Sequence, residues 1–300
     1  MSDYPECLII GGGPAGLTAA LYLARFRRRV ALIDNDGSRA GLIPVSHNFP
    51  GFPDGVTGPQ LLARLHQQLQ PYPVAYLQGT VESLIQENGL FRASFADNET
   101  KAPIVLITTG IADGGMTDPN WSAAIAAGGL RICPVCDAYE VIDKRVAVVA
   151  RSENAAAHAR FLQTYTKDLT LIHAGDGPLA DDCRADLERD GVTVIDSRDV
   201  RLDIDPSGTV RVIVSSETLR FDAVYPMFGC RPRAGLAQGL GAACDEEGKL
   251  LTDAFQQTSV ENVFAAGDVV SGLNQISVAV GQAAIAATHI HHKLAADGAF

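Results

Sequence analysis

The glycine-rich turn near the N-terminus constrains the fold of this chain more than any other feature. Gly11, Gly13 and Gly16 form a G-x-G-x-x-G pattern that follows the apolar run 7–10 and precedes an alanine- and leucine-rich stretch reaching about Arg28. Glycine lets the backbone turn tightly and approach a pyrophosphate, whose charge then lies at the helix N-terminus. The order of strand, glycine turn, helix and strand predicts one βαβ unit that binds a dinucleotide.

Asp34 supports the same prediction from the end of the second apolar strand, 29–34. It follows Gly16 by 18 residues, where a carboxylate accepts a hydrogen bond from a ribose hydroxyl. An acid at this position disfavours a 2′-phosphate, so NAD or FAD fits better than NADP. The alternative is a glycine turn that serves only helix packing, and the agreement of turn, helix and acid argues against it.

The pattern of the N-terminal unit recurs once along the chain. A strand at 145–149, a helical pattern at 154–166 and a strand at 169–173 predict a second βαβ unit. Each unit is followed by a β-rich stretch, at 75–107 and at 192–228, and the tail closes with a helical pattern at 275–294. We expect an α/β fold with two Rossmann-like dinucleotide-binding domains: a discontinuous first domain (1–112 and 244–300) and an inserted central domain (113–243).

Charge and hydropathy exclude several classes of partner. The chain has 24 Lys and Arg against 35 Asp and Glu, and the formal net charge of -11 repels nucleic acid. The first sixteen residues have no basic segment ahead of an apolar run, and no apolar stretch reaches the roughly 18 residues of a membrane-spanning helix. These features predict a cytoplasmic protein and leave peripheral membrane contact open.

Only two of the six cysteines, Cys133 and Cys136, are closely spaced. Structural zinc would need a second pair of ligands, and the histidines at 289, 291 and 292 lie in the other predicted domain, so we predict no metal site. A pair of core cysteines fits poorly with the polar turn that Pro134 and Asp137 indicate. Two thiols at this spacing can close a disulfide, and their thiolates can attack a flavin or another disulfide. A redox-active pair is therefore favoured. The other four, Cys7, Cys183, Cys230 and Cys244, are predicted to be small core residues.

Several short motifs, in their order and spacing, resemble the low-molecular-weight thioredoxin reductases over nearly the whole chain. They are Gly11 to Gly16, Asn48-Phe-Pro-Gly51, Thr57-Gly-Pro59, Thr108-Thr-Gly110, Cys133-Pro-Val-Cys-Asp137 and Val263-Phe-Ala-Ala-Gly-Asp268. The resemblance implies a homodimer and a disulfide or dithiol partner such as a thioredoxin-like protein. It also implies FAD in the first unit, held by Gly11, Gly13, Pro14, Ala15, Gly16, Asp34, Asn48, Gly110, Gly267, Asp268 and Gln275.

The same resemblance implies roles for the cysteine segment. In the family the second cysteine contacts the flavin and the first exchanges with the substrate, which assigns Cys136 to the flavin and Cys133 to the partner. The carboxyl group that follows is the family's acid, so Asp137 would protonate the departing thiolate, with a helix N-cap as the alternative role.

The chain departs from the family pattern at two places near the flavin ring. An Arg-Gln-Ala tripeptide of the family is replaced by Asn274-Gln275-Ile276, and its glycine-glutamine segment is shortened to Gly41-Leu42-Ile43. The contacts to the ring are thus less well specified by sequence than the contacts to the pyrophosphate.

The second nucleotide site has lost its motifs. Its turn reads Ala150-Arg-Ser-Glu-Asn-Ala155, without glycine, and Glu153 adds charge of the same sign as a phosphate. The family's basic run after the next strand is replaced by Ala174-Gly-Asp176. Arg151 alone does not restore a phosphate site, so we expect no tight NADPH binding.

These observations predict a FAD-dependent disulfide or dithiol oxidoreductase that does not use NADPH. The pattern resembles diflavin-linked disulfide oxidoreductases, in which a second FAD lies beside the first. Ferredoxin-dependent flavin thioredoxin reductases are the other variant without pyridine nucleotide. An NADPH-dependent thioredoxin reductase and a non-enzymatic flavin and thiol redox sensor are the alternatives. The sequence leaves the direction of electron flow open.

Overall fold

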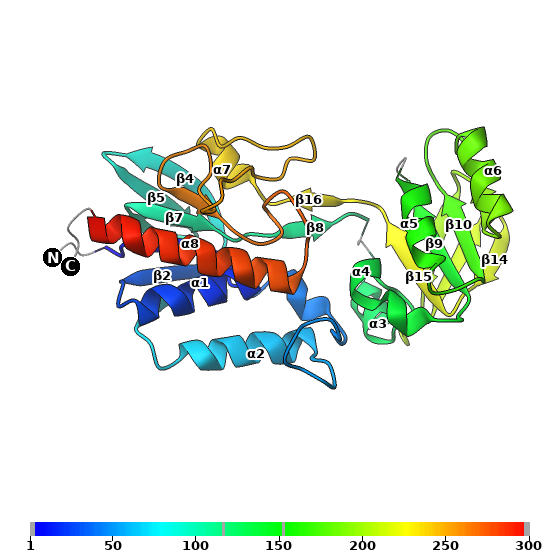
Figure 1. The fold of residues 1–300 in the computed structure, drawn as a ribbon, viewed down its shortest axis with the longest axis horizontal. Helices are drawn as coiled ribbons and strands as arrows, with labels where there is room; N and C mark the ends of the chain where they lie inside the picture. The colour runs from blue at the N-terminus through cyan, green and yellow to red at the C-terminus, as the bar shows by residue number, and fades with distance from the viewer. Residues whose placement is uncertain (1–3, 116–117, 152–153, 297–300) are drawn as a thin grey trace.

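The computed structural model describes residues 4–115, 118–151 and 154–296. The protein forms two lobes joined by a narrow connection (Figure 1). Each lobe is built around a parallel β-sheet, which confirms the predicted α/β fold with two Rossmann-like units.

The first lobe contains a five-stranded parallel sheet in the order β17-β7-β1-β2-β3. Its strands are β1 (Cys7–Ile10), β2 (Val30–Asp34), β3 (Val74–Gln78), β7 (Ile104–Ile107) and β17 (Val263–Ala265). Every residue of β1 and β2 is buried, because both faces of the sheet are covered. Cys7 and Ile9 pack against helices, and Leu8 and Ile10 pack against a second layer of strands.

Helices cover one face of this sheet. The long C-terminal helix α8 (Ile276–Ala296) packs along α1 (Pro14–Arg25), and α2 (Gly58–Leu69) lies beside α1 (Figure 1). The predicted helix to Arg28 is three residues too long, because Arg27 takes a left-handed conformation (φ 63°) that ends the helix. A short 3₁₀ helix, η1 (Arg39–Leu42), precedes α2.

An antiparallel sheet covers the other face. Its strands are β4 (Val81–Glu87), β5 (Leu90–Phe95) and β6 (Asn98–Ala102), and Phe91 and Phe95 join the core beneath β1. The short helix α7 (Gly235–Gly239) contacts β4. This sheet is the middle part of the predicted β-rich stretch 75–107, whose first and last strands, β3 and β7, belong to the parallel sheet.

The second lobe repeats the plan with a four-stranded parallel sheet, in the order β11-β10-β9-β15. These strands are β9 (Val146–Ala150), β10 (Leu169–His173), β11 (Thr193–Asp196) and β15 (Ala223–Met227). Helices α5 (Ala155–Leu162) and α6 (Asp181–Arg189) pack on one face. On the other face lie α3 (Trp121–Ala126) and the antiparallel strands β12 (Val200–Ile204), β13 (Val210–Val214) and β14 (Glu217–Arg220).

Two strands connect the lobes, as Figure 1 shows: β8 (Ile111–Asp113) pairs with β16 (Cys230–Pro232) in antiparallel fashion. Ala234 and Ala237, which follow β16, already belong to the core of the first lobe. We therefore propose a first domain boundary at about residue 112 and a second one nearer Pro232 than residue 243. Among the residues that the structure describes, no helix is both long and apolar enough to cross a membrane.

The four unpaired cysteines differ in exposure. Cys7 is fully buried, as predicted for a small core residue, and Cys183 and Cys244 are half-buried. The prediction is wrong for Cys230, which is exposed because it lies on the narrow connection, where few neighbours cover it.

Candidate active site

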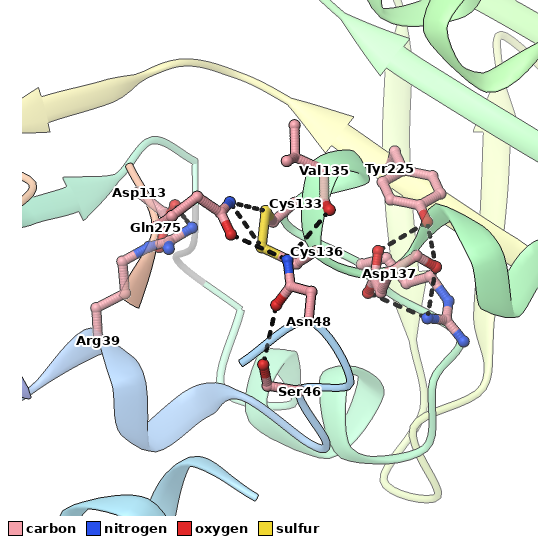
Figure 2. The surroundings of a disulfide bond; sticks show 11 residues. Arg39, Ser46, Asn48, Asp113, Cys133, Val135, Cys136, Asp137, Tyr225 and Gln275 are labelled. Carbon is pink, nitrogen blue, oxygen red and sulfur yellow. Dashed lines mark hydrogen bonds and ion pairs between the residues drawn. A yellow bond between two sulfur atoms is a disulfide. The ribbon is translucent and has the colours of Figure 1, made fainter. Parts of the chain in front are cut away.

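The Cys133–Cys136 segment opens the short helix α4 (Pro134–Asp137), which is followed by the 3₁₀ helix η2 (Ala138–Val141). Cys133 is the N-cap residue, and Pro134 takes a first-turn position where its missing N–H has no helical partner to lose. The Cys136 N–H donates to the Cys133 carbonyl (2.9 Å), and the two Cα atoms lie 5.3 Å apart. The two sulfurs are joined in a disulfide bond (Figure 2).

The carboxamide of Gln275 contacts both sulfurs of the disulfide from the first lobe. Its Nε2 lies 3.3 Å from Cys136 Sγ and 3.6 Å from Cys133 Sγ. Gln275 immediately precedes α8, so the start of this helix aims the amide at the disulfide. Figure 2 shows the amide group directly beside the two sulfur atoms.

Asn48 links Gln275 to the cysteine segment. Its Nδ2 donates to Gln275 Oε1 (3.0 Å) and to the Val135 carbonyl (3.3 Å), and its Oδ1 accepts from the Ser46 hydroxyl (3.1 Å). Ser46 is itself buried and anchored through its backbone to Val56. The loop before α2 thus holds the cysteine segment against the first lobe (Figure 2).

Asp137 is turned away from the sulfurs. Its Oδ2 lies 3.0 Å from Arg131 Nη1, and its Oδ1 accepts from the Tyr225 hydroxyl (2.8 Å). Burial raises the pKa of Asp137, and this effect exceeds the lowering by Arg131 and Tyr225. A raised pKa suits a proton donor near neutral pH. Asp137 occupies the N-cap position of η2, but its side chain makes no capping hydrogen bond there.

A cavity of about 650 Å³ opens beside the disulfide in the first lobe. Its wall includes Cys136 but neither Cys133 nor Asp137. The predicted cofactor-binding residues on the wall are Gly11, Gly13, Pro14, Ala15, Asp34, Asn48, Gly110, Gly267, Asp268 and Gln275. Ten residues that are scattered over the sequence therefore meet around one space.

Gly16 is the predicted contact residue that does not line this cavity. A Cβ atom there would lie 1.8 Å from the Gly11 carbonyl oxygen, so Gly16 allows α1 to pack closely on β1. Gly12, which lines the cavity, would bring a Cβ within 2.4 Å of Asp34 Oδ2. The Gly12 N–H instead donates to Asp34 Oδ1 (2.8 Å). A side chain at Gly12 would therefore collide with Asp34, and a side chain at Gly16 would collide with the Gly11 carbonyl.

Comparison with known proteins identifies the family. Residues 5–283 match the family described as pyridine nucleotide-disulphide oxidoreductase. The chain belongs to this family. It is 28% identical over 275 residues to a thioredoxin reductase of Mycolicibacterium smegmatis, with 88% of each chain covered. It is also 28% identical over 306 residues to a thioredoxin reductase of Peptoclostridium acidaminophilum, with 96% of each chain covered.

Similarity to solved structures agrees with this membership. Thioredoxin reductase from Streptococcus pyogenes superimposes with a TM-score of 0.88 at 28% identity, covering 99% of this chain and 100% of that chain. The protein HlmI superimposes with a TM-score of 0.89 at 27% identity, covering 99% and 95%. The predicted class of enzyme, a thioredoxin reductase-like flavin-dependent disulfide oxidoreductase, is confirmed.

Membership of the pyridine nucleotide-disulphide oxidoreductase family implies FAD, and the cavity of the first lobe fits it. Its volume lies within the range of small-molecule sites, and the N-terminus of α1 points a set of backbone N–H groups at it. Asp34 Oδ1 accepts from the Gly12 N–H, and Asp34 Oδ2 accepts from the Tyr76 hydroxyl (3.0 Å) and from the Asp36 N–H (3.3 Å). Because Oδ1 accepts one bond and a carboxylate oxygen can accept two, Oδ1 has capacity for a ribose hydroxyl.

The corresponding turn of the second unit in this family member is built differently. Arg151 lies with its guanidinium over the Phe228 ring, 4.8 Å from the ring centroid. Asn154 precedes α5, and the predicted turn residues Ser152 and Glu153 lie outside the described residues. The guanidinium of Arg151 therefore stacks on an aromatic ring of its own lobe.

The ends of β10 and β11 carry an internal charge cluster. The buried His173 has its Nδ1 3.0 Å from Asp196 Oδ1, and Arg184 forms an ion pair with the other oxygen of Asp196. The Leu179 N–H donates to the same carboxylate (3.1 Å). The Arg184 guanidinium is thus ion-paired within the protein.

Among the residues around the candidate active site that sequence reasoning missed are Arg39, Arg131 and Tyr225. Arg39 lines the cavity and makes two hydrogen bonds to Asp113 on β8 (2.7 and 2.8 Å). Arg131 and Tyr225 hold the Asp137 carboxyl group. None of them occupies a motif position, and Tyr225 lies 88 residues from its partner, so no spacing could have indicated them.

Proposed function

We propose that this chain is a FAD-dependent thiol–disulfide oxidoreductase that transfers electrons between the flavin and Cys133–Cys136 without using NADPH. The observation that carries the proposal is a contrast. Cys136 lies on the wall of a glycine-lined cavity in the first lobe, whereas the matching edge of the second lobe pairs Arg184 and His173 with Asp196. A guanidinium that is already ion-paired is a poor site for a phosphate.

The two cysteines have different proposed roles. In the direction of dithiol oxidation, a partner thiolate attacks Cys133 Sγ, the bond to Cys136 breaks, and Cys136 leaves as a thiolate with the electron pair of that bond. A second partner thiol then displaces Cys133 and releases the oxidised partner. FAD, when bound, supplies a two-electron acceptor beside Cys136. The reverse sequence reduces a disulfide partner.

Asp137 is the proposed acid and base for these thiol steps. Its raised pKa lets it hold a proton at a higher pH than an ordinary aspartate. In the described conformation it bonds to Arg131 and Tyr225, so the role requires its side chain to rotate toward the sulfurs.

The decisive test of NADPH independence is anaerobic mixing of the purified flavoprotein with NADPH. We expect the flavin absorbance to persist, while a small dithiol bleaches it in the wild type and not in Cys136→Ser. Rapid bleaching by NADPH would overturn the proposal in favour of an NADPH-dependent thioredoxin reductase; the two sequence relatives are named thioredoxin reductases.

We also propose a second FAD beside the first, a thioredoxin-like protein or another dithiol as partner, a homodimer and a cytoplasmic location. The ratio of flavin to protein chain after purification tests the second FAD: a ratio near two supports it and a ratio near one contradicts it. A non-enzymatic redox sensor is distinguished by turnover, because a sensor would change its own thiols stoichiometrically without catalysing oxidation of a partner.

A further inference from the structure

We propose that Gln275 is a catalytic residue for disulfide exchange, which it promotes by donating a hydrogen bond to the thiolate that forms on Cys136. The inference rests on the proposed thiol–disulfide function of the cysteine pair and adds a role distinct from flavin binding. Its basis is the position of Gln275 Nε2 within 3.3 Å of Cys136 Sγ and 3.6 Å of Cys133 Sγ.

The hydrogen-bond network fixes which end of the Gln275 amide faces the sulfurs. The Val135 carbonyl can only accept, so the atom of Asn48 that contacts it is the donor Nδ2. The same Nδ2 contacts Gln275, which must therefore present its oxygen to Asn48. The Ser46 hydroxyl satisfies Asn48 Oδ1 and closes the chain. Gln275 is left with its N–H groups directed at the disulfide.

This orientation favours the reduced pair over the oxidised one. A disulfide sulfur is a weak, neutral acceptor, whereas a thiolate is a charged acceptor, and hydrogen bonds to charged acceptors are about twice as strong as neutral ones. When a partner thiolate bonds to Cys133 and the disulfide breaks, the electron pair of that bond goes to Cys136. Cys136 is also the sulfur closer to Gln275 Nε2. The donor is thus in place before the charge arrives, and no reorganisation is needed.

Asn48 acts through Gln275 and is a positioning residue. Replacing Asn48 with aspartate would remove the donor that holds Gln275 Oε1 and supply an acceptor instead. The Gln275 amide would then turn its N–H groups toward residue 48 and its oxygen toward the sulfurs. The conservative change would reverse the polarity of the contact without removing Gln275.

The test measures the redox equilibrium of the pair in the flavin-loaded protein, without turnover. Wild type, Gln275→Met, Asn48→Asp and the double variant are equilibrated with reduced and oxidised dithiothreitol in graded ratios. The mixtures are quenched in acid, the thiols are labelled, and the peptide containing both cysteines is quantified by mass spectrometry. Gln86→Met, an exposed glutamine on β4, is the matched control.

We expect Gln275→Met to shift the equilibrium about tenfold toward the disulfide, since hydrogen bonds to charged groups contribute roughly this much. Gln86→Met should leave it unchanged. Asn48→Asp should shift it in the same direction, and the double variant should show less than the combined shift, because the two residues act through one contact. Full additivity would overturn the positioning role of Asn48.

A shift below twofold in Gln275→Met, with the FAD content retained, would overturn the catalytic role. If Gln275→Met loses FAD, Gln275→Glu replaces it: a carboxylate with no donor facing the sulfurs should favour the disulfide at least as strongly, and an unchanged equilibrium would again overturn the inference. Failure of the thiol–disulfide function of the cysteine pair gives a different result, because the wild-type pair would then not respond reversibly to dithiothreitol at all; the use of NADPH is decided separately by anaerobic mixing.

Discussion

The two βαβ units share one framework but differ at the turn between the first strand and the helix. In both units the first strand is buried along its whole length and the helix packs on the sheet. In the first unit Gly12 and Gly16 have no room for a Cβ atom. In the second unit Arg151 occupies the turn and covers Phe228. The fold needs only buried strands and an apolar helix face, whereas a phosphate site needs accessible backbone as well.

The largest effect is expected from filling the first turn. Gly16→Ala places a Cβ atom 1.8 Å from the Gly11 carbonyl oxygen, so α1 must move off β1. We expect loss of most bound FAD and of about 3 kcal/mol of unfolding free energy, measured by flavin content and urea unfolding. Gly177→Ala in the second lobe has open space around it and should change stability by less than about 0.5 kcal/mol. Retention of FAD in Gly16→Ala would contradict the packing role.

The next effect tests how Arg131 and Tyr225 hold the Asp137 carboxyl group within the second lobe. Arg131 lowers the pKa of Asp137, so Arg131→Met should raise it further. The Asp137 limb in the pH profile of flavin reduction by a dithiol should then move to higher pH by about one unit. Arg160→Met, at an exposed ion pair on α5, should leave the limb in place. An unmoved limb in Arg131→Met would exclude Asp137 as the titrating group.

A smaller effect is expected at the charge cluster of the second unit, which contains His173, Arg184 and Asp196. Burial alone would raise the pKa of Asp196, but hydrogen bonds from Leu179, Arg184 and His173 lower it below its usual value. A lowered pKa stabilises the fold above the ordinary aspartate range near 4 and loses this contribution as the pH falls through the folded pKa.

Asp196→Asn should therefore cost about 1 kcal/mol or less at neutral pH, since the side chain is 23% exposed and water screens the interaction. The difference from wild type should shrink below pH ~4. Urea unfolding at several pH values measures it, with the exposed Asp176→Asn as control. A difference that is constant with pH would show that the cluster contributes through packing and not through charge.

The smallest effect is expected at Arg151. Its position over Phe228 is worth about 0.5 to 1 kcal/mol at an exposed site. Arg151→Ala should lower stability by that amount and leave the response to NADPH unchanged, as stopped-flow absorbance can measure. Weaker NADPH binding in the variant would mean that Arg151 serves as a phosphate contact after all, and the two units would be less different than we propose.

The sequence predicted the strands of both units well, because four or five consecutive apolar residues are readable without any tertiary information. It predicted helix ends less well: α5 ends at Leu162, not at 166, and α1 ends at Arg25. Cys230 was misassigned for a related reason. Burial depends on what packs over a residue, and an isolated cysteine carries no periodic pattern that would indicate it.

The sequence by itself determined the α/β fold, the glycine turn at Gly11 to Gly16 and the closely spaced pair Cys133 and Cys136, because these features are local and depend on residue type at fixed spacing. Tertiary structure alone decided what surrounds them. Gln275 contacts the sulfurs across 139 and 142 residues of chain, and Tyr225 contacts Asp137 across 88. The Gln275 contacts arise because the two lobes meet, and the Tyr225 contact arises because distant segments pack together within the second lobe. No short-range pattern encodes either of them.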